Sequence, residues 1–204
     1  MPSSPPSSAD PLYPLFLKLA GRKVLVVGGG KVATAKVRAL LDAGATVLVV
    51  APAASPALGE LAAAGKLAVA RRGFEPADLD GAWLVVAAAP PEVAAVVAQA
   101  AEARRVFVLA VDDVAAASAY GAGTLRRGGV TIAVSTGGRA PALAGLLREG
   151  LEAVLPDDLD AWADVAERQR AAWREAGVPI EDRRPLLLRA LDGIYDGRKS
   201  RGST

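Results

Sequence analysis

The sequence predicts an α/β protein with a doubly wound parallel sheet, followed by a small helical region. Three observations support this prediction. Short unbroken apolar runs alternate with stretches of helical period, a glycine cluster follows the first run, and only helical patterns remain after Pro141. Unbroken apolar runs are typical of strands buried on both faces of a parallel sheet. Their alternation with helices is typical of the crossovers of such a sheet.

The first apolar run and the glycine cluster begin a βαβ unit. Lys23–Val27 (KVLVV) predicts a buried strand, and Val32–Ala43 predicts a helix with its apolar residues on one face. Thr46–Val50 (TVLVV) predicts the second strand. The pair Ser55-Pro56 then predicts a helix that has a serine N-cap and a proline at its first position.

The later elements follow from the same patterns. Further strands are expected at Leu67–Arg71, Trp83–Ala88, Val106–Ala110 and Gly129–Ser135, and a further helix at Glu92–Ala103. We expect the last of these strands to be the sixth in the sheet. Amphipathic stretches after Pro141 predict helices only.

Composition excludes several classes of protein and site. The 204 residues include no Cys and no His, which excludes disulfides, thiol or imidazole catalysis and a zinc site of Cys and His. With 52% hydrophobic and 23% charged residues, the chain is not wholly disordered. The net charge of +2 is not concentrated in any stretch, so we expect no nucleic-acid partner. No apolar run approaches the roughly 20 residues of a membrane span, and residues 1–10 do not resemble a signal peptide.

The glycine cluster contains the most specific motif, Gly28-x-Gly30-x-x-Ala33. Between a buried strand and a helix, this spacing is typical of a Rossmann-like dinucleotide site. Gly28 permits a tight turn, Gly30 lets the backbone approach a pyrophosphate, and Ala33 lets the helix pack on the sheet. A glycine turn that binds no ligand is the alternative.

The end of the second strand bears on the choice of dinucleotide. It continues as Ala51-Pro52-Ala53, without the acid that commonly binds a ribose 2′-hydroxyl and without an adjacent Arg for a 2′-phosphate. We therefore expect backbone groups near Pro52 and Ala53 to contact the ribose, with a weak preference for NAD over NADP.

Two further segments place polar groups after strands. Asp112 and Asp113 follow the fifth strand, where a carboxylate can exchange protons or hold a hard cation. A helix cap or turn is the alternative for such an aspartate. The segment 135–140 (STGGRA) offers hydroxyls, glycine amides and Arg139 to an anion. N-capping of the next helix is compatible with the same residues.

With these motifs, the chain resembles the precorrin-2 dehydrogenase family, the siroheme synthase N-terminal family. The resemblance rests on the blocks YPLFLKLAGRKVLVVGGGKVATAKVRALLDAGA, WLVVAAAPPEV, VDDVAAAS and TIAVSTGGRAPALAGLLREGLEAVLP. They follow the family's order and spacing over residues 13–156. No methyltransferase domain follows, so the chain resembles the stand-alone members.

The resemblance implies NAD-dependent oxidation of precorrin-2 to sirohydrochlorin in siroheme biosynthesis. In some members it also implies insertion of Fe²⁺ to give siroheme. The resemblance assigns both the catalytic carboxylate and the transient metal ligand to Asp112. Cofactor contacts fall on Gly28, Gly30, Lys31, Val32, Pro52 and Ala53, and substrate contacts on Thr136, Gly137 and Arg139. Arg126, Arg127 and Arg148 are further candidates to bind substrate carboxylates. A position on the solvated surface is the alternative for each of them.

These expectations divide the chain into four parts. They are a flexible tail (1–12), an NAD-binding Rossmann-like domain (13–140), a helical region for dimerisation and substrate binding (141–196) and a second tail (197–204). We expect a homodimeric cytoplasmic enzyme acting on a tetrapyrrole, without nucleic acid or membrane as a partner. The alternative is a non-catalytic nucleotide-sensing module, which needs the glycine loop but neither the VDD segment nor STGG.

Overall fold

The computed structural model describes residues 11–111, 113 and 115–199, without the side chains of 193–199. The chain forms two compact units. The first comprises the described residues up to Gly121 together with Ser135–Ala140, and the second comprises Ala122–Val134 and the described residues from Pro141 onward. The predicted tails lie largely outside the described residues.

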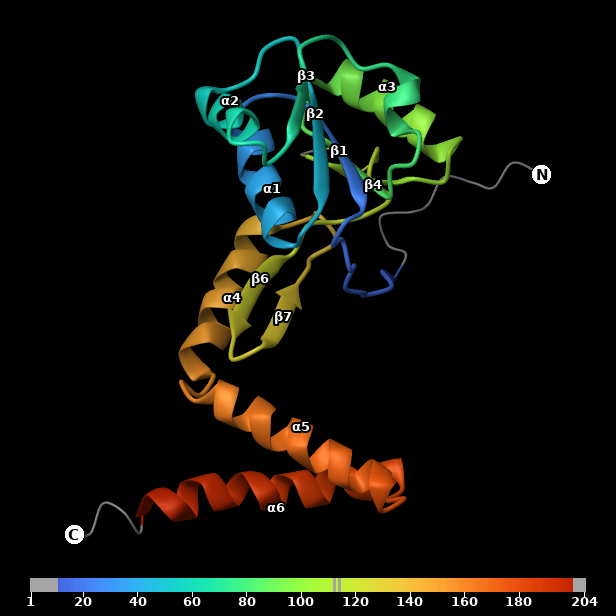
Figure 1. The fold of residues 1–204 in the computed structure, drawn as a ribbon. Helices are drawn as coiled ribbons and strands as arrows, with labels where there is room; N and C mark the ends of the chain where they lie inside the picture. Colours follow the sequence, from blue (N-terminus) through green and yellow to red (C-terminus); the bar gives the residue numbers. More distant parts are fainter. Residues whose placement is uncertain (1–10, 112, 114, 200–204) are drawn as a thin grey trace. The chain divides into compact units, whose positions relative to one another are not determined.

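A five-stranded parallel sheet forms the centre of the first unit, in the order β3-β2-β1-β4-β5 (Figure 1). The strands are β1 (Lys23–Val27), β2 (Thr46–Val50), β3 (Ala68–Ala70), β4 (Leu84–Ala87) and β5 (Phe107–Ala110). The strand order reverses beside β1. In open α/β sheets, ligands bind at such a reversal, beyond the carboxyl ends of the strands. The predicted Rossmann-like fold is thereby confirmed.

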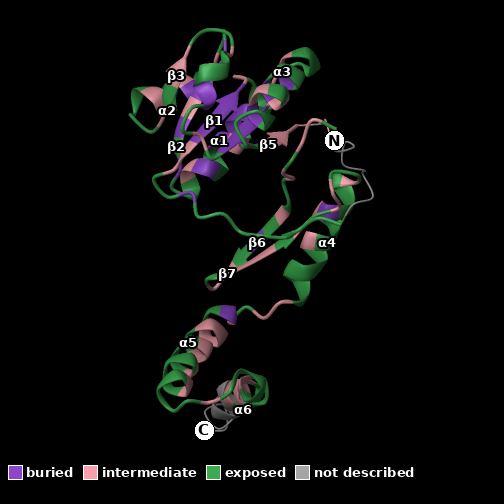
Figure 2. Cartoon of the chain, turned by 90° about the vertical axis from the view of Figure 1, so that its right-hand side faces the viewer, coloured by how far each residue is buried: buried purple, intermediate pink, exposed green. Residues whose placement is uncertain are grey.

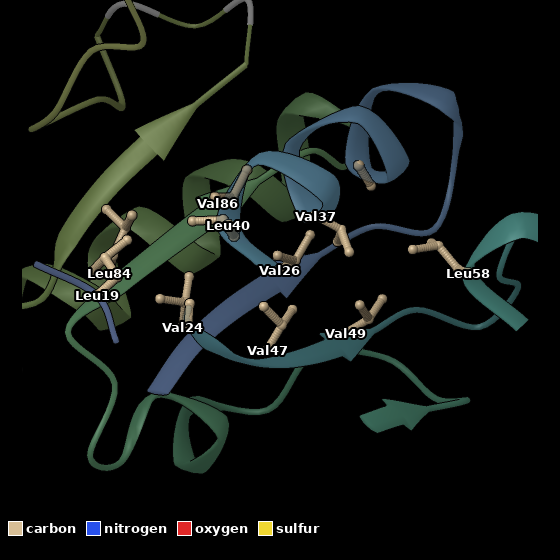
Figure 3. Packing of buried hydrophobic residues seen from close by; sticks show 12 residues of the cluster. Leu19, Val24, Val26, Val37, Leu40, Val47, Val49, Leu58, Leu84 and Val86 are labelled. Carbon is tan, nitrogen blue, oxygen red and sulfur yellow. The ribbon is translucent and has the colours of Figure 1, made fainter. Parts of the chain in front are cut away.

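Helices cover both faces of this sheet, and each face has its own apolar layer. The helices are α1 (Lys31–Asp42), α2 (Pro56–Ala63) and α3 (Pro91–Glu102), with a 3₁₀ turn, η1 (Pro76–Leu79), before β4. Alternate strand residues such as Val26 and Val49 pack against Val37 and Leu40 of α1 (Figure 3). The intervening residues, Leu25 among them, pack on the α3 side.

Valine-rich strands explain why this core is so completely buried. β-Branched side chains suit the pleated surface of a sheet, and both faces of a central strand need them. Residues 24–27 of β1 are all buried, and buried residues gather in β1, β2 and α1 (Figure 2). The predicted cap of α2 is confirmed, since Ser55 Oγ accepts from the Leu58 N–H at 3.4 Å.

The sixth predicted strand requires a correction. β7 (Val130–Val134) is a strand, but it pairs antiparallel with β6 (Gly123–Arg127) and takes no part in the parallel sheet. The two-residue loop Gly128-Gly129 has φ values of 54° and 72°, and two positive φ values suit a tight hairpin whose twist matches its strands. This hairpin clusters with the second unit, whereas the predicted division placed it in 13–140.

The second unit combines this hairpin with α4 (Pro141–Val154), α5 (Leu159–Glu175) and α6 (Ile180–Lys199). The hairpin packs against α4, and β7 also contacts α5. A Cβ at Gly128 would collide with the Asp160 backbone, so the turn abuts the start of α5. Among the described residues, no helix is both long and apolar enough to cross a membrane.

Candidate functional site

The glycine loop between β1 and α1 passes between two strand ends. Gly28 has a φ of 123°, and a Cβ at this position would collide with the carbonyl oxygen of Ala88, just past β4. A Cβ at Gly29 would collide with the carbonyl oxygen of Ala53, just past β2. Only glycine therefore fits at these two positions, and the role predicted for Gly28 is explained by its neighbours. The requirement for Gly29 was not predicted.

Gly30 differs from both of its neighbours because it faces open space. A Cβ at Gly30 would meet no atom of the residues that the structure describes within 4 Å. Gly30 is the N-cap of α1 and provides no side-chain cap. The first N–H groups of a helix have no intrahelical acceptor, and the helix dipole favours an anion there. Open space beside these donors fits the pyrophosphate of a dinucleotide.

A chain of hydroxyl groups holds the glycine loop to the start of α2. The buried Thr34 donates from Oγ1 to Gly30 O at 2.9 Å, and its Oγ1 lies 2.8 Å from Ser55 Oγ. Since the Thr34 proton is used on Gly30, Ser55 is the donor between the two hydroxyls. Ser55 N–H also donates to Gly29 O at 2.8 Å. These bonds fix the position of the loop relative to the end of β2.

The predicted cofactor contacts therefore come together at one edge of the sheet. Pro52 and Ala53 are exposed beside the glycine loop, and Lys31 and Val32 are exposed in the first turn of α1. Ala33, the third position of the motif, is fully buried between α1 and the sheet as predicted. The arrangement offers a dinucleotide backbone donors, an open N-terminus and exposed strand-end residues.

The segment after β5 contains the predicted catalytic residue. Asp112 lies outside the described residues. Before it, Val111 N–H donates to Ala87 O at 3.0 Å and extends the parallel ladder to the carboxyl edge. After it, Asp113 Oδ1 accepts from the N–H groups of Ala115 and Ala116, at 3.0 and 3.1 Å. Asp113 thus takes the turn role that was the alternative reading of this pair.

The same segment folds back on β5 through Ser118, a residue that sequence reasoning did not single out. Ser118 Oγ accepts from Val108 N–H at 2.8 Å. The N–H groups of Ser118 and Ala119 both donate to Val108 O, at 3.0 and 2.9 Å. Ser118 closes the loop that begins at Val111 and satisfies the backbone of an edge strand.

The loop of 135–140 is held largely by its own hydrogen bonds. Thr136 Oγ1 accepts from Ala140 N–H at 3.1 Å, immediately before α4 begins. Thr136 O accepts from Nε of the exposed Arg139 at 3.3 Å. Gly137 and Gly138 both have positive φ, and a Cβ at Gly137 would lie 3.6 Å from Leu12 Cδ1. The described hydrogen bonds of this loop do not reach the glycine loop, so its role toward substrate stays a prediction.

The arginines that are candidates to bind substrate carboxylates differ in their contacts within the protein. Arg127 donates to Leu155 O at 2.8 Å, and Arg148 pairs with Glu149 and Glu152 at 3.0 and 2.7 Å. Both side chains therefore serve the second unit itself. Arg126 and Arg139 are exposed.

Among the described residues, the ion pair with the shortest contact lies just after β3. Arg72 holds the buried Asp78 through two hydrogen bonds, of 2.6 and 2.9 Å, and Glu75 N–H donates to the same carboxylate at 2.9 Å. The Arg72 hydrogen bond, and then the Glu75 N–H, hold the Asp78 pKa below its ordinary 3.8 against the opposing effect of burial. This pair fixes the chain between β3 and β4.

Comparisons with known proteins agree with this geometry. Residues 15–121 match a family described as "Putative NAD(P)-binding", and residues 127–153 match a sirohaem biosynthesis protein central region. Siroheme synthase 1 of Aeromonas salmonicida is 44% identical over 87% of this chain. Siroheme synthase 3 of Aeromonas hydrophila is 46% identical over the same share. The chain spans only 38% of the length of each.

A solved structure resembles most of the chain. It is described as SirC, a precorrin-2 dehydrogenase, and superposes with a TM-score of 0.66 at 26% identity. The match covers 87% of this chain and 88% of that one. The similarity therefore includes the parallel sheet and extends beyond it.

Proposed function

The chain belongs to the NAD(P)-binding family that it matches, and from this membership we propose that it is an NAD-dependent dehydrogenase that oxidises precorrin-2 to sirohydrochlorin in siroheme biosynthesis. The observation that carries the proposal is the open space at Gly30, beside the first N–H groups of α1, which have no intrahelical acceptor and no side-chain cap from Gly30. The names of the similar proteins, siroheme synthase and precorrin-2 dehydrogenase, supply the substrate.

In the proposed reaction, NAD⁺ supplies the hydride acceptor when it is bound. Gly30 and the first-turn amides of Lys31 and Val32 hold the pyrophosphate, and backbone groups of Pro52 and Ala53 contact the ribose. Precorrin-2 loses two hydrogens in this oxidation. One leaves a C–H bond as hydride, with the electron pair of that bond, and the second leaves as a proton. Asp112, the residue that follows Val111 in the sequence, accepts that proton.

The substrate is a reduced tetrapyrrole that carries carboxylates at its rim. We propose that Thr136, Gly137 and Arg139 bind it, because a loop with a hydroxyl and a guanidinium suits carboxylates. The exposure of Arg139 supports this assignment, since its charge is available to a ligand.

The test is to incubate the protein with precorrin-2 and NAD⁺ under anaerobic conditions and to follow the absorbance of sirohydrochlorin. The proposal expects sirohydrochlorin and NADH to appear together. Binding of NAD⁺ without turnover of active substrate would instead indicate a nucleotide-sensing module and would reject the enzymatic proposal.

Two variants separate the neighbouring aspartates. We expect Asp112→Ala to lower kcat by about 100-fold or more, because a general base typically contributes 10²–10⁴-fold, while NAD⁺ binding is kept. Asp113→Ala should be milder, because Asp113 already caps a turn. Full activity of Asp112→Ala would show that this assignment is wrong.

Insertion of Fe²⁺ into sirohydrochlorin is a second candidate activity, favoured by the name of the similar siroheme synthases. Asp112 would accept the pyrrole protons and serve as a transient ligand to the metal substrate. In the described residues, no three acidic side chains gather as a metal site. Adding Fe²⁺ to the protein with sirohydrochlorin, and measuring siroheme above the rate without protein, tests this activity.

We also propose that the protein is a cytoplasmic homodimer whose helical region forms the contact. Support comes from α4, where large apolar side chains are exposed at helical spacing: Leu143, Leu146, Leu147 and Val154. An exposed apolar stripe of this kind is typical of a protein interface.

A further inference from the structure

The end of β3 lies beside the end of β2, where a dinucleotide places its adenosine ribose. The two strands run parallel with Val50 beside Ala70, and Ala51 N–H donates to Ala70 O at 3.1 Å. Arg71 directly follows β3, so the peptide that joins Ala70 to Arg71 lies against Ala51, directly before Pro52. Adjacent strands are roughly 4.8 Å apart, and an arginine side chain is long enough to cross that gap.

Arg71 and its neighbour Arg72 differ in their contacts. The guanidinium of Arg72 is held by Asp78 through two hydrogen bonds and also lies 3.9 Å from Glu75. Arg71 is exposed, and no residue in the described part of the chain forms an ion pair or hydrogen bond with its guanidinium. Arg71 therefore keeps a full set of donors for a ligand.

The end of β2 also lacks the group that would reject an additional phosphate. Sites selective for NAD place an acid there, which binds the ribose 2′-hydroxyl and repels a 2′-phosphate. The residues that follow β2 are Ala51, Pro52, Ala53, Ala54 and Ser55, with no carboxylate among them. The nearest acidic side chain described after β3 is Glu75, which faces Arg72.

From this arrangement we propose that Arg71 binds the 2′-phosphate of NADP, so that the site accepts NADP as well as NAD. The inference rests on the proposed dinucleotide site and adds a specificity-determining residue to it. Arginine suits a phosphate because its planar fork donates two hydrogen bonds at once. The linear sequence conceals this residue, since the pairing of β3 with β2, up to Ala70 and Val50, is what brings Arg71 close to the end of β2.

The experiment is to measure the Kd of NAD⁺ and of NADP⁺ for the full chain, as wild type and as Arg71→Gln. The inference expects the variant to weaken NADP⁺ binding by roughly tenfold or more, as for loss of a hydrogen bond to a charged group. NAD⁺ binding should change less than about twofold, because the 2′-hydroxyl needs no cation. Arg38→Gln, an exposed arginine on α1, is the matched control and should change neither.

Each other outcome has a separate meaning. If NAD⁺ binds the wild type and NADP⁺ does not, or if Arg71→Gln leaves NADP⁺ binding unchanged, the inference is overturned while the proposed function stands. If the variant weakens both dinucleotides equally, Arg71 contacts a shared part of the ligand and the assignment to the 2′-phosphate is overturned. If neither dinucleotide binds the wild type, the proposed function itself fails. Thermal unfolding of both variants checks that they are folded.

Discussion

At the scale of single residues, the three consecutive glycines after β1 have different physical roles. Gly28 and Gly29 are each required by a backbone carbonyl on the opposite side of the loop, whereas no atom in the described part of the chain lies within 4 Å of a Cβ placed at Gly30. A glycine that the fold does not need, at the N-terminus of a helix, is best explained by a ligand that approaches the backbone.

This difference predicts opposite effects of alanine at two neighbouring positions. Gly28→Ala should lower the free energy of unfolding by about 2–3 kcal/mol, because the new Cβ forces backbone to move. Gly30→Ala should change it by less than about 0.5 kcal/mol, yet raise the NAD⁺ Kd roughly tenfold or more, as the Cβ takes the space of the pyrophosphate. Urea unfolding and ligand titration measure the two effects. Unchanged NAD⁺ binding in Gly30→Ala would contradict the site.

Asp78 predicts a specific dependence of stability on pH. Its pKa is lower in the folded protein than its ordinary 3.8, so its contribution is complete above that value and disappears as pH falls through the folded pKa. Asp78→Asn should cost about 1–2 kcal/mol at pH 7, since Arg72 is partly exposed and the pair is screened. The gap between the two proteins should close as the pH falls through the folded pKa of Asp78, which lies below 3.8.

Urea unfolding at several pH values checks this prediction, with Asp80→Asn as the control. The Asp80 side chain is 69% exposed and pairs only with Arg104, at 3.2 Å, among the described residues. Its loss should have less than about 0.5 kcal/mol of effect. An Asp78→Asn deficit of the same size at all pH values would mean that packing, not charge, explains it.

At the scale of elements, β5 shows how an edge strand is protected. Ser118 returns to accept from Val108 N–H, so Ser118→Ala removes one partner of a buried strand residue. We expect a loss of about 1 kcal/mol in the free energy of unfolding. Ser135→Ala is the matched control, because Ser135 Oγ accepts only within an exposed turn and its loss should matter less. Equal losses in urea unfolding would contradict the special role of Ser118.

Most elements could be predicted because their signals are local. The valine runs of β1 and β2 and the Ser55-Pro56 cap each depend on a few adjacent residues, and the structure confirms them. The prediction that β7 joins the parallel sheet was wrong. β7 pairs instead with β6, whose sequence is far less apolar than that of β7. β6 reads GTLRR, which resembles no buried strand, although Gly128-Gly129 was a usable hairpin signal.

The candidate site was predictable only where its parts are adjacent in the chain. The spacing of the glycine motif was enough to predict it from the sequence. The proximity of Arg71 to the end of β2 was not predictable in this way, because it follows from strand pairing. Position in the sequence alone did not distinguish Asp113 from Asp112. The hydrogen bonds that Asp113 accepts within the turn now give it a structural role, which the two alanine variants can test. Assignment of catalysis to Asp112 rests on family resemblance.

At the scale of the whole molecule, the proposed dimer predicts a particle of about twice 20.7 kDa. Leu147→Glu, in the exposed apolar stripe of α4, should shift the protein to monomer, since burying an unpaired charge in an interface is costly. Ala63→Glu, at an exposed position of α2, is the control and should leave the mass unchanged. Light scattering on the eluted protein measures both, and a wild-type monomer would contradict the dimer.

The most direct test of the account follows the hydrogen that leaves the substrate. Precorrin-2 labelled with deuterium at the carbon that is oxidised is mixed with the protein and NAD⁺ in a single turnover without oxygen, and the nicotinamide is analysed by mass spectrometry. We expect one deuterium in each NADH, formed in step with sirohydrochlorin. Label that appears in water while NADH stays unlabelled would contradict hydride transfer to a dinucleotide held at the glycine loop.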